Sequence, residues 1–147
     1  MADETPALLT AQPTWLISQV SAIAHRMLAD RLAAVGARGY HVRLLAALAE
    51  FGPSSQADLG RRTAMDRSDV VATVNELADQ GLARRSVDPA DRRRNVITIT
   101  PGGTARLEQL AGLLAGVQDD LLAPLTLADR DRLANSLTQV LDYHAGT

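Results

Sequence analysis

The sequence lacks cysteine altogether in its 147 residues. This absence excludes a disulfide framework, a zinc site built on thiolates and a redox switch that works through cysteine. Lysine is also absent, so all 15 basic side chains are arginines, whose planar guanidinium groups suit phosphates and guanine edges. No apolar run reaches the roughly 18 residues that a membrane-spanning helix needs, and we expect no such span.

Motifs for catalysis are missing as well. The three histidines, His25, His41 and His144, lie on three different expected helices and lack the HxxxH spacing of a metal site. No nucleophile elbow, P-loop or dinucleotide-binding glycine motif occurs. We therefore expect no enzyme, no metal and no cofactor. Acidic Asp3 and Glu4 stand where a secretory signal would carry basic residues, so we expect a cytoplasmic protein.

The composition is that of an ordinary globular protein, with 46% hydrophobic and 22% charged residues. A chain of 147 residues can bury the core of one domain, so we expect a single domain over residues 1–147. The net charge is only −2, which means that any surface for nucleic acid must be local. Residues 61–94 hold such a local excess, with eight arginines and six acidic residues.

Two short β-prone runs, 83–87 and 96–100, flank a polar tip. Asp88-Pro89 ends the first run, because proline has no N–H for the ladder. Arg92, Arg93 and Arg94 follow one another in the tip. We interpret this stretch as a two-stranded hairpin. A phosphate backbone attracts such a cationic tip strongly, although a solvated charge cluster is the alternative interpretation.

Apolar periodicity predicts helices on both sides of the hairpin. They cover about residues 14–35, 40–50, 56–63, 67–80, 101–122 and 127–145. Residues 1–12 are expected to form a loose arm, because Pro6 and Pro13 discourage helix there. The expected N-caps are Ser54 or Ser55, Asp66, Thr100 and Thr126. The helix over 40–50 is expected to bury Val42, Leu45, Ala46, Leu48 and Ala49.

Leucine and valine recur at alternating intervals of three and four residues in the helix expected over 101–122. This spacing is typical of a coiled-coil seam. A single small domain would leave such a seam uncovered, so we expect it to lie in a dimer interface. Its members are Leu107, Leu110, Leu114, Val117 and Leu121.

A short helix, a turn and a longer half-polar helix lead directly into the hairpin. That order is typical of a helix-turn-helix with a β-wing. In the longer helix Val70, Val74 and Leu77 recur on one side, whereas Ser68 and Ala72 lie on the other. The expected fold class is therefore mainly α with a small β-wing, as a winged helix-turn-helix domain.

Five segments have an order and spacing that match a known family. They are Ser55-Gln56-Ala57-Asp58-Leu59, Met65-Asp66-Arg67-Ser68, Gly81-Leu82 with Arg85, Asp88-Pro89-Ala90-Asp91-Arg92-Arg93, and Ile97-x-Ile99-Thr100-Pro101-Gly102-Gly103. Together they resemble the MarR family of bacterial transcription regulators, over about residues 14–143. The resemblance implies a winged helix-turn-helix at about 37–101, flanked by N- and C-terminal dimerisation helices at about 14–35 and 102–145.

The resemblance also implies a function. It indicates a homodimer that binds a pseudo-palindromic DNA operator and releases it when a small ligand binds, as a ligand-responsive repressor or as an activator. Members that sense oxidants through a cysteine are excluded as a model for this chain, which has none. The alternative function is a winged-helix module that contacts another protein and binds no DNA.

The first turns of a recognition helix usually reach base edges in the major groove, which points to Arg67, Ser68, Ala72 and Thr73. Arg67 suits a guanine, unless it pairs with a neighbouring aspartate at the surface. Acidic Glu76 is awkward on a helix that faces DNA, as is Asp69. Either they accept hydrogen bonds from cytosine or, as we favour, they lie beyond the contacted turns.

By resemblance, Arg93 enters the minor groove, where a narrow A·T-rich segment concentrates negative potential. Asp91 then supports the wing. Arg92 and Arg94 approach phosphates, while Arg61 and Arg62 either touch phosphate or stay at the surface. The predicted DNA-binding residues are Ser55, Gln56, Arg61, Arg62, Arg67, Ser68, Thr73, Arg92, Arg93 and Arg94.

Pockets of the family lie where the dimerisation helices meet the winged domain. A small aromatic or phenolic effector is therefore expected near the scarce rings of that region, for which packing or surface positions are the alternative. These rings are Trp15, His25, Tyr40 and His41. Dimerisation is assigned to apolar positions on the first and last helices, which are Leu16, Val20, Leu133, Leu137 and Val140.

Overall fold

The computed structural model describes residues 4–146, so residues 1–3 and 147 of the expected domain, Asp3 among them, lie outside the described residues. The described part is mainly helical with a small sheet, as predicted. The elements in chain order are α1 (Ala7–Thr10), α2 (Pro13–Ala34), α3 (Gly39–Phe51), β1 (Ser54–Ser55), α4 (Gln56–Thr63), α5 (Arg67–Asp79), β2 (Ala83–Val87), β3 (Asn95–Ile99), α6 (Pro101–Leu121) and α7 (Leu127–Ala145).

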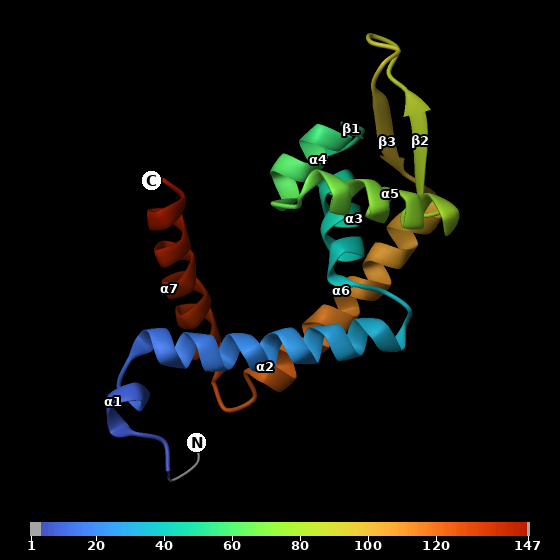
Figure 1. The fold of residues 1–147 in the computed structure, drawn as a ribbon. Helices are drawn as coiled ribbons and strands as arrows, with labels where there is room; N and C mark the ends of the chain where they lie inside the picture. The colour runs from blue at the N-terminus through green and yellow to red at the C-terminus, as the bar shows by residue number, and fades with distance from the viewer. Residues whose placement is uncertain (1–3, 147) are drawn as a thin grey trace.

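Figure 1 shows two parts of the molecule. The winged domain, residues 39–99, contains α3, α4, α5 and the sheet, and its β2–β3 hairpin projects beyond the rest of the chain. Beneath it α2 and α6 cross, and α7 stands apart from the winged domain. Among the described residues, no helix is long and apolar enough to cross a membrane.

Three of the expected N-caps form the predicted side-chain hydrogen bonds. Ser55 Oγ accepts the backbone N–H of Asp58 at 3.1 Å, and Thr100 Oγ1 accepts that of Gly103 at 3.0 Å. Thr126 Oγ1 accepts the N–H of Asp129 at 3.2 Å. Asp66 occupies the N-cap position of α5 without a side-chain capping bond. These caps satisfy backbone donors that a helix start leaves unpaired, and so they explain why the boundaries were readable locally.

The N-terminal arm is more ordered than predicted, because residues 7–10 form the short helix α1. Pro6 precedes this helix as its N-cap residue, and its carbonyl accepts the N–H groups of Leu9 at 3.0 Å and Thr10 at 3.2 Å. A proline at this position loses nothing, since the first backbone N–H groups of a helix have no partner inside it. The expectation of a loose arm is wrong for this segment.

The sheet has three strands in the order β1-β3-β2, not the two of a simple hairpin. β2 pairs with β3 in antiparallel fashion, with Arg85 opposite Ile97. On its other edge β3 pairs with β1, where Ser54 lies opposite Ile97 and Ser55 opposite Val96. Two serines carry no strand pattern of their own, so β1 exists only because the edge of β3 is there to pair with it.

The core of the winged domain is apolar and continuous. Its largest fully buried side chains come from α3, α4, α5, β3 and α6, and include Leu44, Leu45, Leu48, Leu59, Leu77, Ile97 and Leu110. Within α3 the predicted face is partly wrong, since Ala46 and Ala49 are exposed while Leu44 and Ala47 are buried. Helix α3 is apolar on several sides, and its packing against α4, α5 and α6 selects the buried one.

Four of the five leucine and valine side chains of the α6 seam are covered within the chain. Leu110 and Val117 are fully buried, and Leu107 and Leu114 pack against the core of the winged domain. Helices α2 and α3 of the same chain supply the covering surface. The expectation of a dimer interface is therefore wrong for these four residues, whereas Leu121 lines an apolar groove between α2 and α7. Most of the exposed large apolar side chains lie instead on α7 and on the first half of α2, and others lie on α1, at Phe51 and at Val87.

Candidate nucleic-acid interface

A tight turn joins α4 to α5. Ala64 ends α4 in the left-handed conformation, with φ of 53°, and the N–H of Met65 bonds to the carbonyl of Gly60 at 3.2 Å. A Cβ on Gly60 would lie 3.3 Å from the carbonyl oxygen of Met65, so this glycine allows the close approach. The turn leaves one side of α5 open to solvent, and the residues on that surface are Asp66, Arg67, Ser68, Val71, Ala72 and Asn75.

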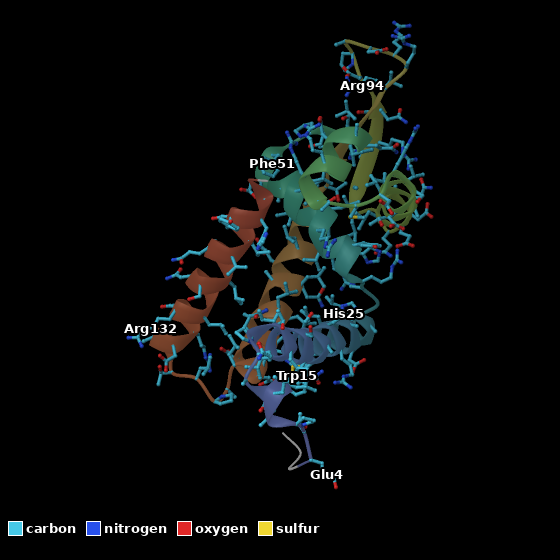
Figure 2. All side chains as sticks on the ribbon, turned by 60° about the vertical axis from the view of Figure 1, so that its left-hand side comes forward. Glu4, Trp15, His25, Phe51, Arg94 and Arg132 are labelled. Carbon is cyan, nitrogen blue, oxygen red and sulfur yellow. The ribbon has the colours of Figure 1, made fainter. Side chains whose placement is uncertain are left out.

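A concave surface connects α4 and the start of α5 with the tip of the wing. We call it the DNA-facing surface. It brings together six of the predicted DNA-binding residues from β1, α4, α5 and the tip of the wing, although the wing residues lie more than 25 positions further along the chain. These six are Ser55, Gln56, Arg61, Arg67, Arg93 and Arg94. Figure 2 shows Arg94 on the wing, which reaches furthest from the remainder of the molecule.

The tip of the wing is closed by its own hydrogen bonds. Asp91 Oδ1 accepts the backbone N–H of Arg93 at 3.0 Å and its Nε–H at 3.2 Å. The N–H of Asp88 donates to the carbonyl of Arg94 at 2.8 Å, and the N–H of Arg94 donates to that of Asp91 at 3.0 Å. The guanidinium and N–H of Arg93 hold the pKa of the Asp91 carboxyl below its usual range. The side chain of Arg93 is nevertheless 91% exposed, so it is oriented and still accessible.

Thr73 is a wrong prediction. Its side chain is fully buried, and its hydroxyl has no hydrogen-bond partner. With Val70, Val74 and Leu77 it occupies positions i, i+3, i+4 and i+7 of α5, which is the face against the core. A polar residue type suggested a base contact, but the helical phase places this side chain inside the protein.

The arginines at the end of α4 are both engaged. Arg61 pairs with Asp58 at 2.8 Å and stays 68% exposed. Arg62 donates to Ser54 Oγ at 3.0 Å, and its guanidinium lies 4.6 Å from the centre of the Phe51 ring. Arg62 does not line the DNA-facing surface, and neither does Arg92. Arg67 makes no ion pair with a neighbouring aspartate in the described part of the chain, so its guanidinium remains available.

Two of the three acidic residues of α5 pair with residues at the start of α3. Glu76 accepts two hydrogen bonds from Arg38 Nη2, at 2.8 and 2.6 Å, and lies 2.6 Å from His41 Nε2. Asp69 accepts a hydrogen bond of 3.4 Å from the hydroxyl of Tyr40. Neither carboxylate therefore projects freely from the helix. Both sequence explanations, a cytosine contact and a position beyond the contacted turns, missed this pairing.

Two residues beside the open side of α5, Asn75 and Arg85, were not among the predicted DNA-binding residues. Arg85 of β2 donates from Nη2 to the side-chain oxygen of Asn75 and so joins the wing to α5. Asn75 lies seven residues after Ser68, a spacing that places both on one side of the helix. This spacing was the signal in the sequence that could have identified Asn75.

A second cavity lies where α2, α3 and α6 meet. It contains two of the four rings predicted to contact an effector, His25 and Tyr40. Trp15 lies ten residues before His25 on α2, about 15 Å along the axis, and does not line it. His41 does not line it either, because its side chain is buried against α5. The lining residues are His25, Leu28, Ala29, Arg38, Gly39, Tyr40, Val42, Arg43 and Leu114.

An apolar groove runs between α2, the end of α6 and α7. Four of the five predicted dimerisation residues line it, namely Leu16, Val20, Leu133 and Leu137. The fifth, Val140, lies further along α7 and is 53% exposed. Every residue of α7 from 131 onward is exposed, which is unusual for a helix with this many leucines.

Comparisons with known proteins agree with this geometry. Residues 37–94 match the profile of the MarR family. The HTH-type transcriptional repressor NicR of Pseudomonas putida is 31% identical over 98 residues, which are 67% of this chain and 62% of the repressor. The chain spans between about half and 62% of the length of the curated relatives it matches.

Two solved structures share the whole fold. A probable transcriptional regulator from Pseudomonas aeruginosa is 31% identical with a TM-score of 0.78, over 90% of this chain and 98% of that one. BpsR of Bordetella bronchiseptica, whose DNA binding is regulated by 6-hydroxynicotinic acid, is 24% identical with a TM-score of 0.79, over 94% of this chain and 99% of that one.

Proposed function

This chain belongs to the MarR family of transcriptional regulators, and from that premise we propose that it binds a pseudo-palindromic operator as a homodimer and represses transcription. One observation carries the proposal. Six predicted DNA-binding side chains from β1, α4, α5 and the wing tip share the DNA-facing surface. Four of them are arginines, so a phosphate backbone would find both charge and hydrogen-bond donors there.

The two parts of this surface have different tasks. The first turns of α5 enter the major groove, where Arg67 and Ser68 meet base edges. The wing follows the backbone to the adjacent minor groove, where Arg93 is inserted. Asp91 limits the directions that the Arg93 guanidinium samples before binding, so less conformational entropy is lost when DNA binds.

The pairing of the acidic residues favours DNA over a protein partner. A partly acidic recognition face was the main argument for a winged-helix module that binds no DNA. The charge of Glu76 is compensated by Arg38, and Asp69 is bonded to the hydroxyl of Tyr40, so neither carboxylate projects freely toward a partner. The open side of α5 then offers Arg67, Ser68 and Asn75 as polar groups, with Asp66 as its single acidic residue.

A homodimer would cover the apolar side chains that a single chain leaves exposed on α2 and α7. With two-fold symmetry, two recognition helices would enter successive major grooves about 34–36 Å apart along the duplex. An inverted repeat with half-sites about 10 base pairs apart is therefore expected.

We also propose a small aromatic acid as the effector, in the cavity between α2, α3 and α6. Its wall combines the Tyr40 ring with two guanidinium groups, whose central carbons lie 6.0 Å (Arg38) and 5.7 Å (Arg43) from the ring centre. An aromatic carboxylate matches this lining in both its parts. The regulation of BpsR by 6-hydroxynicotinic acid supports the same chemical class.

The test is a binding titration against a random pool of duplexes, followed by measurements on the selected sequence at several salt concentrations. We expect a symmetric site and an affinity that falls steeply with salt, because bound arginines release counterions from phosphates. A protein without sequence preference, or with an affinity that does not respond to salt, would contradict the proposal.

A further inference from the structure

The side chain of Arg38 contacts both the cavity between α2, α3 and α6 and the recognition helix α5. Its side chain lines the cavity between α2, α3 and α6. The same guanidinium donates through Nη2 to both carboxylate oxygens of Glu76, at 2.8 and 2.6 Å, and so holds the recognition helix α5. Tyr40 repeats the arrangement more weakly, since it lines the cavity and its hydroxyl donates to Asp69 of α5 at 3.4 Å.

His41 bonds to both partners of the contact between Arg38 and Glu76. Its Nδ1 accepts the backbone N–H of Arg38 at 3.2 Å, so the proton lies on Nε2 and is donated to Glu76 at 2.6 Å. The His41 side chain is only 7% exposed and has no room to turn away. The backbone of Arg38 is therefore tethered, and only its guanidinium is free to change partner.

We propose that Arg38 is a positioning residue that couples the cavity to the recognition helix, because the carboxylate of an aromatic acid in the cavity competes with Glu76 for its guanidinium. The inference rests on the proposed function, of which it gives the regulation. When the ligand takes Arg38, α5 loses both hydrogen bonds from that guanidinium and keeps the bond from His41 to Glu76 and the weaker one from Tyr40 to Asp69. The helix then departs from the orientation in which Arg67 and Ser68 read bases.

The exposure of the pair makes this exchange feasible. The side chains of Arg38 and Glu76 are 53% and 40% exposed, so water screens their attraction and the guanidinium can leave at moderate cost. Arg43, also in the cavity wall, makes no ion pair in the described residues and would add a second cation for the ligand. A ligand shifts an equilibrium only by its preference for one state, and here that preference is access to Arg38.

Thermodynamic linkage gives a test in both directions. Benzoate is the probe, and uncharged benzamide of nearly the same shape is its control. In the wild type we expect benzoate to weaken operator binding about five-fold or more, and benzamide to leave it unchanged. Glu76→Gln removes the competitor, so free protein should bind benzoate several-fold tighter, while operator affinity should no longer respond to benzoate.

Two further variants separate this role from a merely structural one. Asp79→Asn removes the same charge from the same helix at an exposed position, and should keep the full response to benzoate. Arg38→Gln should lose benzoate affinity and the response together, and Arg38→Lys should restore part of both, because lysine keeps the charge without the planar fork. Circular dichroism and thermal unfolding check that each variant is folded. The tighter benzoate binding expected of Glu76→Gln is also a result that a damaged fold would not produce.

The outcomes are distinguishable from failure of the proposed function. If Glu76→Gln binds the operator and still responds to benzoate as the wild type does, the coupling through Arg38 is wrong and the regulator remains. If wild-type protein does not bind benzoate, the proposed competition between the ligand and Glu76 for Arg38 is wrong as well. If no duplex binds with sequence preference, the regulator itself fails, and the benzoate affinities of the variants still decide whether Glu76 and the ligand compete.

Discussion

The carboxylate oxygen Oδ1 of Asp91 accepts hydrogen bonds from both the backbone and the side chain of Arg93. The backbone N–H of Arg93 lies at 3.0 Å and its side-chain Nε–H at 3.2 Å. The acidic and basic residues at the tip of the wing therefore form one unit. The carboxylate also accepts a longer bond of 3.5 Å from Arg93 Nη2 and so sets the direction of the guanidinium, while the Arg93 side chain stays 91% exposed. The wing is in this sense organised before any nucleic acid arrives.

The first prediction concerns this unit. Arg93→Ala should weaken operator binding by about 1–3 kcal/mol per half-site, most where the flanking steps are A·T-rich, because a minor-groove cation is lost. The slope of log affinity against log salt should also flatten. Titrations of matched operators at two salt concentrations measure both effects.

Two controls accompany the wing variant. Arg92→Ala removes an equal charge outside the DNA-facing surface and should cost less. Ser68→Ala should alter which bases are preferred inside the half-site, since base edges are read directly there. Wild-type affinity of Arg93→Ala on every operator would mean that the wing only completes the fold.

The second prediction follows from the buried hydroxyl of Thr73, which has no partner. Thr73→Val keeps the shape and removes an unsatisfied polar group, so the free energy of unfolding should rise by about 1 kcal/mol. Thr63→Val is the matched control, because Thr63 Oγ1 donates to the carbonyl of Leu59 at 2.6 Å, and that variant should be destabilised. Urea unfolding of both variants decides, and a loss of stability in Thr73→Val would show that its hydroxyl is satisfied in solution.

The third prediction concerns the junction of the wing with α6. A Cβ on Gly103 would overlap the carbonyl oxygen of Leu82 and lie 2.7 Å from Ile99 Cγ1. Because one of these neighbours is backbone, Gly103→Ala should destabilise the fold by about 3 kcal/mol or more. In the same helix a Cβ on Gly112 would meet nothing within 4 Å, so Gly112→Ala should stabilise it by up to about 1 kcal/mol. Equal effects of the two variants on thermal unfolding would contradict this reasoning.

The fourth prediction tests the dimer through α7. Leu137 lines the apolar groove and is 41% exposed in the single chain. Leu137→Asp should dissociate the dimer while leaving the winged domain folded, since no core residue is touched. Ser136→Asp, next to it on α7 and outside the groove, should remain dimeric. Sedimentation equilibrium at micromolar concentrations separates the two, and a wild-type monomer would end the proposal.

The fifth prediction is a dependence of stability on pH. Hydrogen bonds from His41 and then from Arg38 hold the pKa of Glu76 below its ordinary value of 4.5. Because the pKa of Glu76 is lowered in the folded state, the folded protein binds this proton only at a lower pH than the unfolded chain does. The stabilisation is thus complete above the ordinary value and disappears as the pH falls through the folded pKa.

Glu76→Gln should accordingly lose stability near neutral pH and differ less from the wild type in acid. Because bonds from Arg61 and Ser55 lower the pKa of Asp58, and bonds from Arg93 lower that of Asp91, the variant should still lose stability in acid to some extent. Urea unfolding across a pH series measures the difference. A constant difference between wild type and variant at every pH would contradict the linkage.

Much of this protein was readable from the sequence, because the relevant signals are local. The strand over 83–87 ends at Val87 as predicted, since Asp88-Pro89 cannot continue a ladder. The caps Ser55, Thr100 and Thr126 bond to backbone groups three residues away, so their effect needs no other part of the chain. The order of helix, turn, helix and wing follows from such signals alone.

What only the tertiary structure decided depends on neighbours that are distant in sequence. The strand β1 exists because the edge of β3 is there to pair with it, and most of the leucine seam of α6 is covered by α2 and α3 of the same chain. Thr73 is buried because α5 turns that face to the core. Glu76 forms an ion pair because the start of α3 brings Arg38 close to it. Residue type and spacing set what each helix can present, but the packing of one helix on another decides which side chains meet.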